Sequence, residues 1–486
     1  REDRPLAAAT EAVAEAESVS FERARTDHAA AWQQLWDDSD VRIDGPLDDQ
    51  LAARFSVFQL LINASRDDAG VSIPAKGITG EGYRGMVFWD TDIHMTPFFI
   101  FTQPGRARNL MTFRHRTLDG ARAKAERYGY RGAMYPWETG YSGEEETEKW
   151  LRLITHQVHI TADVVYAMMQ YVETTRDMAF YEDGAAEALI ETARFWVSKA
   201  EDRGGHVSIP EAGGPDEYHV AEDDSAYVNN LAIRNLRWAV AAADHLKANA
   251  PEKWEALGRR IGVTDDELAR FADYAGRIRT MLHDDGRFEQ CDGFFELDEE
   301  RITEGHRERS PHTTTTVKQA DVIMLLCLLP DEWGREVLEA NYDYYEPRTV
   351  HASSLSYAAY GMVALELGRM EQAEQYIRRS MGMDLADEMN NAASGAHMAA
   401  TGMNWVGIVR GFGGARPQGE RFLVAPRLPQ SWRRLEFRLK WRGAEFTVDA
   451  RPDGVTVTND EGAAAALPLR LADREVDLAP GKSTSA

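Results

Sequence analysis

The stretch that decides the fold is residues 150–172, "WLRLITHQVHITADVVYAMMQYV". Apolar side chains recur in it every three to four residues, at Trp150, Ile154, Val158, Ala162, Val165 and Met169. This spacing is typical of an α-helix with one buried stripe, not of a strand, whose side chains alternate between two faces. The stretch therefore predicts a helix that packs against other elements along one face.

The helical period continues outward from this stretch, from the first forty residues, which are rich in Ala and Glu, to about Gly414. Similar stretches begin near Leu47, Ala185, Ser225, Glu252, Asp265, Lys318, Asp331, Ser354, Glu371 and His397. About ten to twelve helices, joined by alternately short and long loops, predict a toroid of paired helices with its functional loops at one face.

The period changes in the last part of the chain. "LEFRLKWRG" alternates Leu435, Phe437, Leu439 and Trp441 with charged residues, and "AEFTVDARPDGVTVT" follows with turn residues inside it. This alternation predicts half-buried antiparallel strands and a small β-sandwich. We therefore expect linker helices in residues 1–40, a helical barrel in 41–415 and a β-sandwich in 416–486.

Composition limits the possible partners and cofactors. The formal charge of −25 over 486 residues argues against nucleic acid and anionic membranes as partners. Cys291 and Cys327 are far apart and lack metal-ligand spacing, and no dinucleotide-binding or Walker-type loop occurs, so no metal or cofactor is expected. Without a signal peptide or an apolar run of roughly 18–20 residues, the expected location is cytoplasmic.

"GGPDEYH", residues 213–219, interrupts the helical pattern. Two glycines and a proline predict a rigid turn, directly followed by Asp216 and Glu217. A rigid turn positions a side chain well, and the charge of Asp216 is expected to raise the proton affinity of Glu217, as a general acid requires. The alternative is a solvent-facing carboxylate at the start of a helix.

Two loops combine tryptophan with carboxylates. Trp89 and Asp90 lie in "FWDTD", and Trp137 and Glu138 lie in "YPWE". An indole ring packs on the C–H face of a pyranose while carboxylates accept hydrogen bonds from its hydroxyls, so these loops indicate a carbohydrate cleft. The alternative is that both tryptophans are core residues.

Two further groups of polar residues fall near predicted helix starts. Lys318 and Gln319 precede an apolar helix, where a lysine is commonly a surface cation whose stem covers apolar surface. Ser353 and Ser354 follow His351, and His397 follows "SGA". Hydroxyls and an imidazole at helix starts can bind an oxyanion such as phosphate, although serines there also act as helix caps.

Together these segments resemble the catalytic domain of glycoside hydrolase family 65, which includes inverting disaccharide phosphorylases. The resemblance extends from about Trp32 to the end of the chain. Six motifs in the same order carry it: "SIPAKGITGEGYRGMVFWDTDIHMTPFF", "GAMYPWETGYSGEE", "GGPDEYH", "VKQADV", "YYEPRTVHASSLS" and "SGAHMAATGMNWVGIVRGFGG". It implies a mainly α fold, an (α/α)6 barrel followed by a small C-terminal antiparallel β-sandwich.

The resemblance also implies roles for individual residues. Glu217 matches the general acid. Asp90, Trp137 and Glu138 match the positions that hold the glucosyl unit in the −1 subsite, with Trp89 beside them. Lys318 and Gln319 match further glucose contacts. The phosphate-binding positions are matched by Ser353, Ser354 and His397.

These roles imply inverting phosphorolysis of an α-glucoside, a disaccharide or a glucosyl-polyol, to β-glucose 1-phosphate. Inorganic phosphate is the co-substrate, and because it is already an anionic nucleophile it needs no catalytic base. Family hydrolases instead have a glutamate-based water site where this chain has "VHASSLS". An inverting α-glucosidase and a non-catalytic glycan-binding protein are the alternative hypotheses.

The chain departs from the family pattern in several places. Family phosphorylases carry an N-terminal β-sandwich, and this sequence begins within the linker helices that follow it, which leaves the acceptor and a possible homodimer undetermined. Met86 stands where His is common, "DIH" at 92–94 where Glu-Ile-Phe is expected, and Ala352 where Asp is usual. The three substitutions indicate an unusual acceptor or a weakened site.

Overall fold

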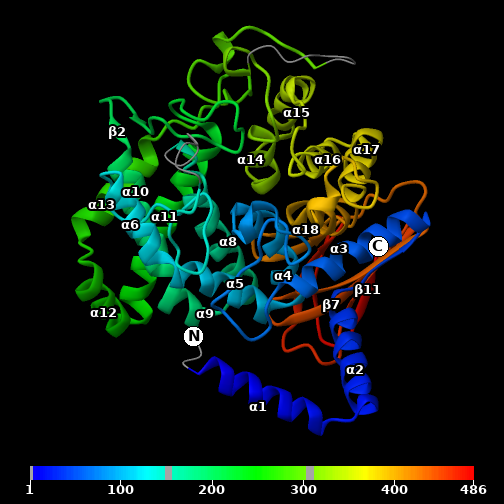
Figure 1. Cartoon of the computed structure of the whole chain (residues 1–486). Helices are drawn as coiled ribbons and strands as arrows, with labels where there is room; N and C mark the ends of the chain where they lie inside the picture. Colours follow the sequence, from blue (N-terminus) through cyan, green and yellow to red (C-terminus); the bar gives the residue numbers. More distant parts are fainter. Residues whose placement is uncertain (1–3, 148–155, 303–310) are drawn as a thin grey trace.

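The computed structural model describes residues 4–147, 156–302 and 311–486, and it consists of a helical body beside a C-terminal β domain (Figure 1). This confirms the predicted fold class. The α-helices are α1 Pro5–Ser18, α2 Phe21–Ser39, α3 Leu47–Asn63, α4 Thr96–Thr102, α5 Pro104–Arg116, α6 Leu118–Arg127, α8 Ile160–Thr175, α9 Met178–Phe180, α10 Ala186–Lys199, α11 Ala226–Asn249, α12 Pro251–Ile261, α13 Asp265–Arg277, α14 Val322–Leu328, α15 Arg335–Tyr345, α16 Tyr357–Glu366, α17 Met370–Met381 and α18 Met398–Val406.

The helices of the body form an inner and an outer set. Helices α4, α8, α14, α16 and α18 are buried almost all round, whereas α12, α13, α15 and α17 bury one face and expose charged residues on the other. Pairs such as α10 with α11 and α16 with α17 pack against each other, and α18 packs against α3, so the last helix of the barrel contacts its first. A ring of paired helices results, in which the outer helices cover the apolar inner ones and keep them from water.

Within its described part, residues 156–172, the predicted helix is interrupted at Gln157 and Val158. Trp150 and Ile154 lie outside the described residues, and α8 begins only at Ile160. Val158 is buried but not helical, because the neighbouring Gln157 pairs as a parallel β-bridge with Gly213. The prediction of a helix through Val158 is therefore wrong, whereas Ala162, Val165 and Met169 are buried in α8 as expected.

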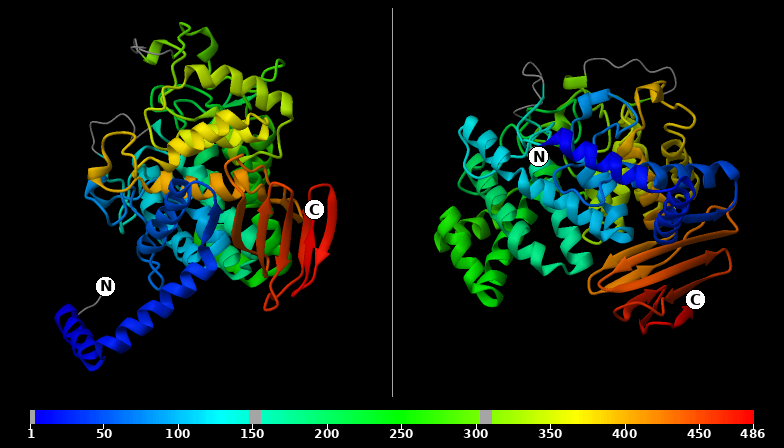
Figure 2. Two further views of the ribbon diagram at one scale, coloured as in Figure 1. Left: turned by 90° about the vertical axis from the view of Figure 1, so that its right-hand side faces the viewer. Right: turned by 60° about the horizontal axis from the view of Figure 1, so that its bottom comes forward.

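The C-terminal domain is a pair of β-sheets, whose orange and red strands lie beside the helices in Figure 2. One sheet has the order β1-β6-β7-β8-β11 and the other β10-β9-β5-β4. The strands are β1 Val41–Asp44, β4 Ala415–Gln418, β5 Arg421–Val424, β6 Arg434–Trp441, β7 Ala444–Arg451, β8 Gly454–Asn459, β9 Leu467–Leu471, β10 Arg474–Leu478 and β11 Ser483–Ser485, and a separate hairpin pairs β2 Glu201–Asp202 with β3 Val207–Ser208. The apolar residues predicted to alternate inward along β6 are all buried.

The larger sheet takes its edge strand from the other end of the chain. Val41 of β1 pairs with Phe437 of β6, although the sequence analysis grouped residues 41–44 with the barrel. Further along, the indole of Trp432 donates a 2.7 Å hydrogen bond to Asp49 of α3. These contacts tie the sandwich to the first barrel helix. Upstream of them, α1 has no buried residue and extends away from the body with α2 (Figure 2).

Across the described ranges, no helix combines the length and the apolar character that crossing a bilayer requires. Both cysteines are buried free thiols, and Cys327 lies within α14 among apolar neighbours.

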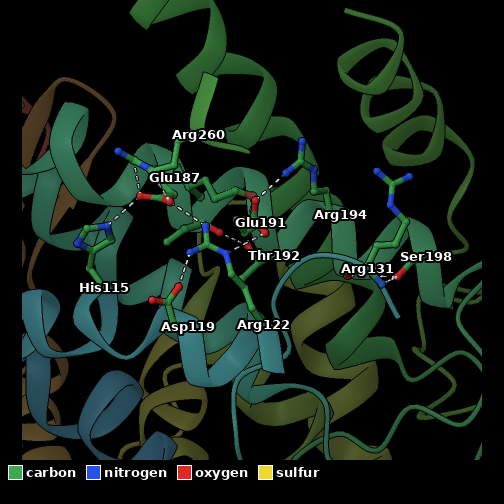
Figure 3. A network of polar contacts seen from close by, with 12 residues as sticks. His115, Asp119, Arg122, Arg131, Glu187, Glu191, Thr192, Arg194, Ser198 and Arg260 are labelled. Atoms are coloured by element: carbon green, nitrogen blue, oxygen red, sulfur yellow. Dashed lines mark hydrogen bonds and ion pairs between the residues drawn. The ribbon is translucent and has the colours of Figure 1, made fainter. Parts of the chain in front are cut away.

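Charged side chains link four helices on the outside of the barrel (Figure 3). Glu187 of α10 accepts hydrogen bonds from Arg122 of α6 at 2.7 Å and Arg260 of α12 at 2.6 Å, and it lies 3.3 Å from the ring of His115 of α5. Burial alone would raise the pKa of Glu187, but the hydrogen bonds from His115, Arg122 and Arg260 outweigh it and lower the pKa to about 2.

Replacing Glu187 by Gln is therefore expected to destabilise the protein in a pH-dependent way. A carboxylate with a lowered pKa stabilises the folded state above its unfolded value and loses that contribution as pH falls toward about 2. We expect a loss of roughly 2–3 kcal/mol at pH 7 that shrinks at pH 3, read as a thermal unfolding midpoint at each pH. The control is Glu255→Gln, whose carboxylate is 71% exposed in its pair with Arg259. An equal loss at both pH values would contradict the electrostatic explanation.

Candidate active site

One pocket of the barrel collects the ten residues to which the sequence analysis assigned a catalytic, sugar-binding or phosphate-binding role. It has a volume of about 290 Å³, near the lower end of the roughly 300–1,000 Å³ of small-molecule sites. Its lining includes Trp89, Asp90, Trp137, Glu138, Glu217, Lys318, Gln319, Ser353, Ser354 and His397. These residues come from loops that are far apart in the sequence, as the predicted toroid requires. Lys76, Tyr83 and Asn391 also line the pocket and were missed.

A larger cavity of about 570 Å³ lies between the barrel and the sandwich. Its arginines are largely neutralised, since Arg416 pairs with Asp331 and Arg442 with Glu420. The chemistry expected of a sugar site lies in the smaller pocket, so volume alone does not identify the site.

The turn that carries Glu217 depends on the two glycines before it. A Cβ on Gly214 would lie 2.4 Å from an Asp321 carboxylate oxygen and 2.9 Å from the hydroxyl of Ser225. A Cβ on Gly213 would lie 2.8 Å from the carbonyl oxygen of Val220. No other residue fits here without displacing these neighbours, which is why the sequence has glycines at this point.

Asp216 supports this turn through several hydrogen bonds. Its buried carboxylate accepts hydrogen bonds from His219 at 2.7 Å, Gln290 at 2.8 Å and the backbone N–H of Lys318 at 2.9 Å. Its own N–H donates to Asp321 at 3.0 Å. These bonds fix Asp216 as a structural support of the turn that presents Glu217.

The charge beside Glu217 is positive. The ammonium of Lys318 lies 2.8 Å from Glu217 Oε1, and the two side chains are 23% and 26% exposed. Lys318 is thus part of the pocket and not the surface cation that its position before an apolar helix also allowed. An acid that is partly exposed, on a rigid turn and beside a cation is well placed to contact a bound ligand.

Gln319 serves the same turn with one end of its amide. Its Nε2 donates to the carbonyl oxygen of Pro215, while its buried Oε1 has no hydrogen-bond partner in the described part of the chain. A buried, unsatisfied carbonyl is costly, and a ligand hydroxyl in the pocket would satisfy it. The amide nitrogen that a glucose contact would also use is already engaged.

The two tryptophans are core residues that also face the pocket. Trp89 is 2% exposed and meets His159 edge-on at 4.8 Å, and Trp137 is 6% exposed and meets the same ring at 5.6 Å. The core explanation thus applies to both indoles, since the surrounding rings fix the orientation of each, and their sugar-binding role stays a prediction.

The carboxylates near the tryptophans differ in their surroundings. Burial raises the pKa of Asp90 to about 7, and the charges of Asp92 and Glu217 contribute to the increase. Glu138 is ion-paired with Arg84 at 2.6 Å. Asp90 is therefore a carboxyl group that changes protonation near neutral pH. The sequence alone does not predict this change.

His397 lies directly before α18, and the carboxylate of Asp384 orients its ring. Asp384 lies 2.6 Å from His397 Nδ1 and also accepts the His397 backbone N–H at 3.0 Å. Nδ1 is thereby engaged, so Nε2 is the ring nitrogen left for a ligand. Ser353 and Ser354 lie in the turn before α16. The Ala352 N–H donates to the carbonyl oxygen of Lys318 at 3.0 Å and so joins this turn to the segment that carries Lys318 and Gln319.

The departures from the family pattern have separate structural explanations. Asp92 forms a buried ion pair with Arg114. The Arg114 guanidinium also donates to the carbonyl oxygen of Phe88, so this ion pair fixes the backbone of the "FWD" segment. His94 is buried against Trp89 at 4.6 Å, and burial lowers its pKa to about 3. Neither side chain lines the pocket; Ala352 does.

Fold and pocket together define the class: an (α/α)6-barrel protein whose pocket combines tryptophans with carboxylates. The chain belongs to glycosyl hydrolase family 65. The central catalytic domain of that family matches residues 54–406, and its C-terminal domain matches residues 415–478.

Several characterised proteins are similar to this chain. The kojibiose phosphorylase of Halothermothrix orenii is 37% identical over 91% of this chain and 60% of its own length. The 1,2-alpha-glucosylglycerol phosphorylase of Bacillus selenitireducens is 35% identical over 92% of this chain and 63% of its own length. A solved structure described as a candidate kojibiose phosphorylase from the human microbiome superposes with a TM-score of 0.92 at 27% identity, covering 100% of this chain and 68% of its own. The chain thus spans about 60% of the length of the curated relatives that it matches.

Proposed function

We propose that this protein catalyses inverting phosphorolysis of an α-glucoside, with Glu217 as the general acid. The observation that carries the proposal is the composition of the pocket. An acid on a rigid turn shares it with Ser353, Ser354 and His397, which can donate hydrogen bonds to an anion. Among the described lining residues the carboxylates are Asp90, Glu138 and Glu217. The names of the relatives, which are phosphorylases, support the same reaction.

In the proposed reaction Glu217 donates its proton to the glycosidic oxygen as the bond from that oxygen to the anomeric carbon breaks. A phosphate oxygen, held by the two serines and His397, forms the new bond from the opposite face of the sugar. The products are the free acceptor alcohol and β-glucose 1-phosphate, with inversion at the anomeric carbon. Trp89, Asp90, Trp137, Glu138, Lys318 and Gln319 hold the glucosyl unit while its ring passes through an oxocarbenium-like state.

The test is a phosphate-dependence assay on a panel of α-linked glucobioses and glucosylglycerol. Phosphate-dependent release of β-glucose 1-phosphate is the expected result. Release of glucose at a rate independent of phosphate would identify an inverting hydrolase instead. No cleavage of any glucoside, combined with binding of the sugars, would identify a glycan-binding protein.

His397→Ala is expected to raise the Michaelis constant for phosphate by roughly 10–100-fold and that for the glucoside by much less. A hydrogen bond to a charged group contributes about 1.5–3 kcal/mol, and the lost contact belongs to the anion. Initial rates over a grid of both substrate concentrations separate the two constants. His28→Ala, on the projecting helix α2, is the control. Equal increases in both constants would contradict the assignment of His397 to phosphate.

A further inference from the structure

A buried ion pair supports the loop that carries Trp137 and Glu138. Glu145, further along this loop, and Lys124 of α6 are 4% and 1% exposed, and Lys124 Nζ lies 2.6 Å from Glu145 Oε2. Burial alone would raise the pKa of Glu145, but the adjacent ammonium outweighs it and lowers the pKa. The carboxylate therefore stays ionised inside the protein.

The hydrogen bonds of this pair converge on the backbone of the two pocket residues. Glu145 Oε2 accepts the N–H of Trp137 at 3.0 Å, and Oε1 accepts the N–H of Glu138 at 3.2 Å and the hydroxyl of Thr147 at 2.7 Å. Lys124 also donates to the carbonyl oxygen of Tyr135 at 3.4 Å. Three backbone groups in the "YPWE" loop are thus held by one ion pair.

We propose that Glu145 is the positioning residue of the −1 subsite: its ionised carboxylate sets Trp137 and Glu138 against the sugar, and Lys124 is its charge partner. The inference rests on the proposed function, because it takes these two residues to contact the glucosyl unit. A carboxylate is required because it accepts at both oxygens. Glutamine would turn an NH2 group toward one of the backbone N–H donors or toward Lys124, and no hydrogen bond forms between two donors.

A buried ion pair could instead serve stability alone, and a charge-neutral double variant separates the two roles. Glu145→Gln by itself leaves a buried ammonium without its partner, which is strongly destabilising. Glu145→Gln combined with Lys124→Met removes both charges and keeps similar volumes, so it should recover much of the lost stability. It does not recover the second acceptor oxygen, so the "YPWE" backbone stays released.

The experiment measures the thermal midpoint, steady-state kinetics and D-glucose binding by calorimetry for the wild-type chain, Glu145→Gln, Lys124→Met and the double variant. We expect the double variant to regain most of the midpoint but to keep a kcat/KM for the glucoside at least tenfold below wild type, with weaker glucose binding. The Michaelis constant for phosphate should change by less than about threefold, because the anion contacts other loops. Glu187→Gln, at a residue that does not line the pocket, is the control for a loss of stability without a loss of activity.

Full recovery of kcat/KM and glucose binding in the double variant would overturn the inference, as would a Glu145→Gln variant that folds and binds glucose like wild type. If Glu145→Gln does not fold, the double variant decides alone. A wild-type chain that binds glucose but cleaves no glucoside contradicts only the proposed function, since glucose binding by the variants still tests the positioning role. A wild-type chain that binds no glucose contradicts both.

Discussion

Glu217→Gln is expected to reduce phosphorolysis of an α-glucoside by about 10²–10⁴-fold, which is the usual contribution of a general acid. The amide has nearly the same size as the carboxyl group and removes only the proton that the leaving oxygen needs. Lys318 loses its partner at 2.8 Å, but at 23% exposure its ammonium remains hydrated. The fold is therefore preserved, and circular dichroism and the thermal midpoint should match those of the wild type.

A substrate that leaves without protonation makes this test specific. Fluoride is a good leaving group, so α-glucosyl fluoride should lose far less rate in Glu217→Gln than a disaccharide does. Glu222→Gln, a substitution in the same segment outside the pocket lining, is the matched control. Near-normal turnover of the disaccharide, or an equal loss on both substrates, would contradict the role of Glu217 as the acid.

Asp90→Asn is expected to stabilise the free protein while it weakens substrate binding and turnover. The pKa of Asp90 is about 7 in the folded protein and 3.8 in the reference state, because burial disfavours its charge. The folded state therefore holds more protons than the unfolded state between these values, and stability falls as pH rises through them. The asparagine variant escapes this loss, so at pH 8 it should be more stable by roughly 3–4 kcal/mol, with the difference vanishing toward pH 4.

The catalytic cost of the same substitution should be about 10–100-fold in kcat/KM, since hydrogen bonds from sugar hydroxyls to a carboxylate are weakened. Thermal midpoints between pH 4 and 8 and the pH profile of kcat/KM give the two effects. Asp92→Asn is the contrasting control: it breaks the buried pair with Arg114 and should destabilise the fold by about 3–5 kcal/mol. A less stable Asp90→Asn variant at pH 8 would contradict the burial argument.

Much of the fold follows from periodicity. The alternation along Leu435–Trp441 predicts β6 because a half-buried strand needs apolar residues at every second position, and a 3.6-residue period predicts barrel helices such as α8 for the corresponding reason. The limits of a helix depend on other segments. Gln157 pairs with Gly213 as a β-bridge, so α8 begins only after this pair, at Ile160. Neither residue has a local sequence signal that predicts the pairing.

The sequence by itself also determined which loops form the pocket, since local chemistry, a Trp beside an acid or an acid after a Gly-Pro turn, is visible in single motifs. Only the tertiary structure decided how those groups are held and charged. It binds Asp384 to His397, pairs Lys318 with Glu217 and places Glu145 over Lys124. It also surrounds Asp90 with enough protein to move its pKa to about 7. Desolvation and hydrogen bonding depend on neighbours that the fold brings from distant parts of the chain. These neighbours do not recur at a regular spacing, so the sequence pattern cannot predict them.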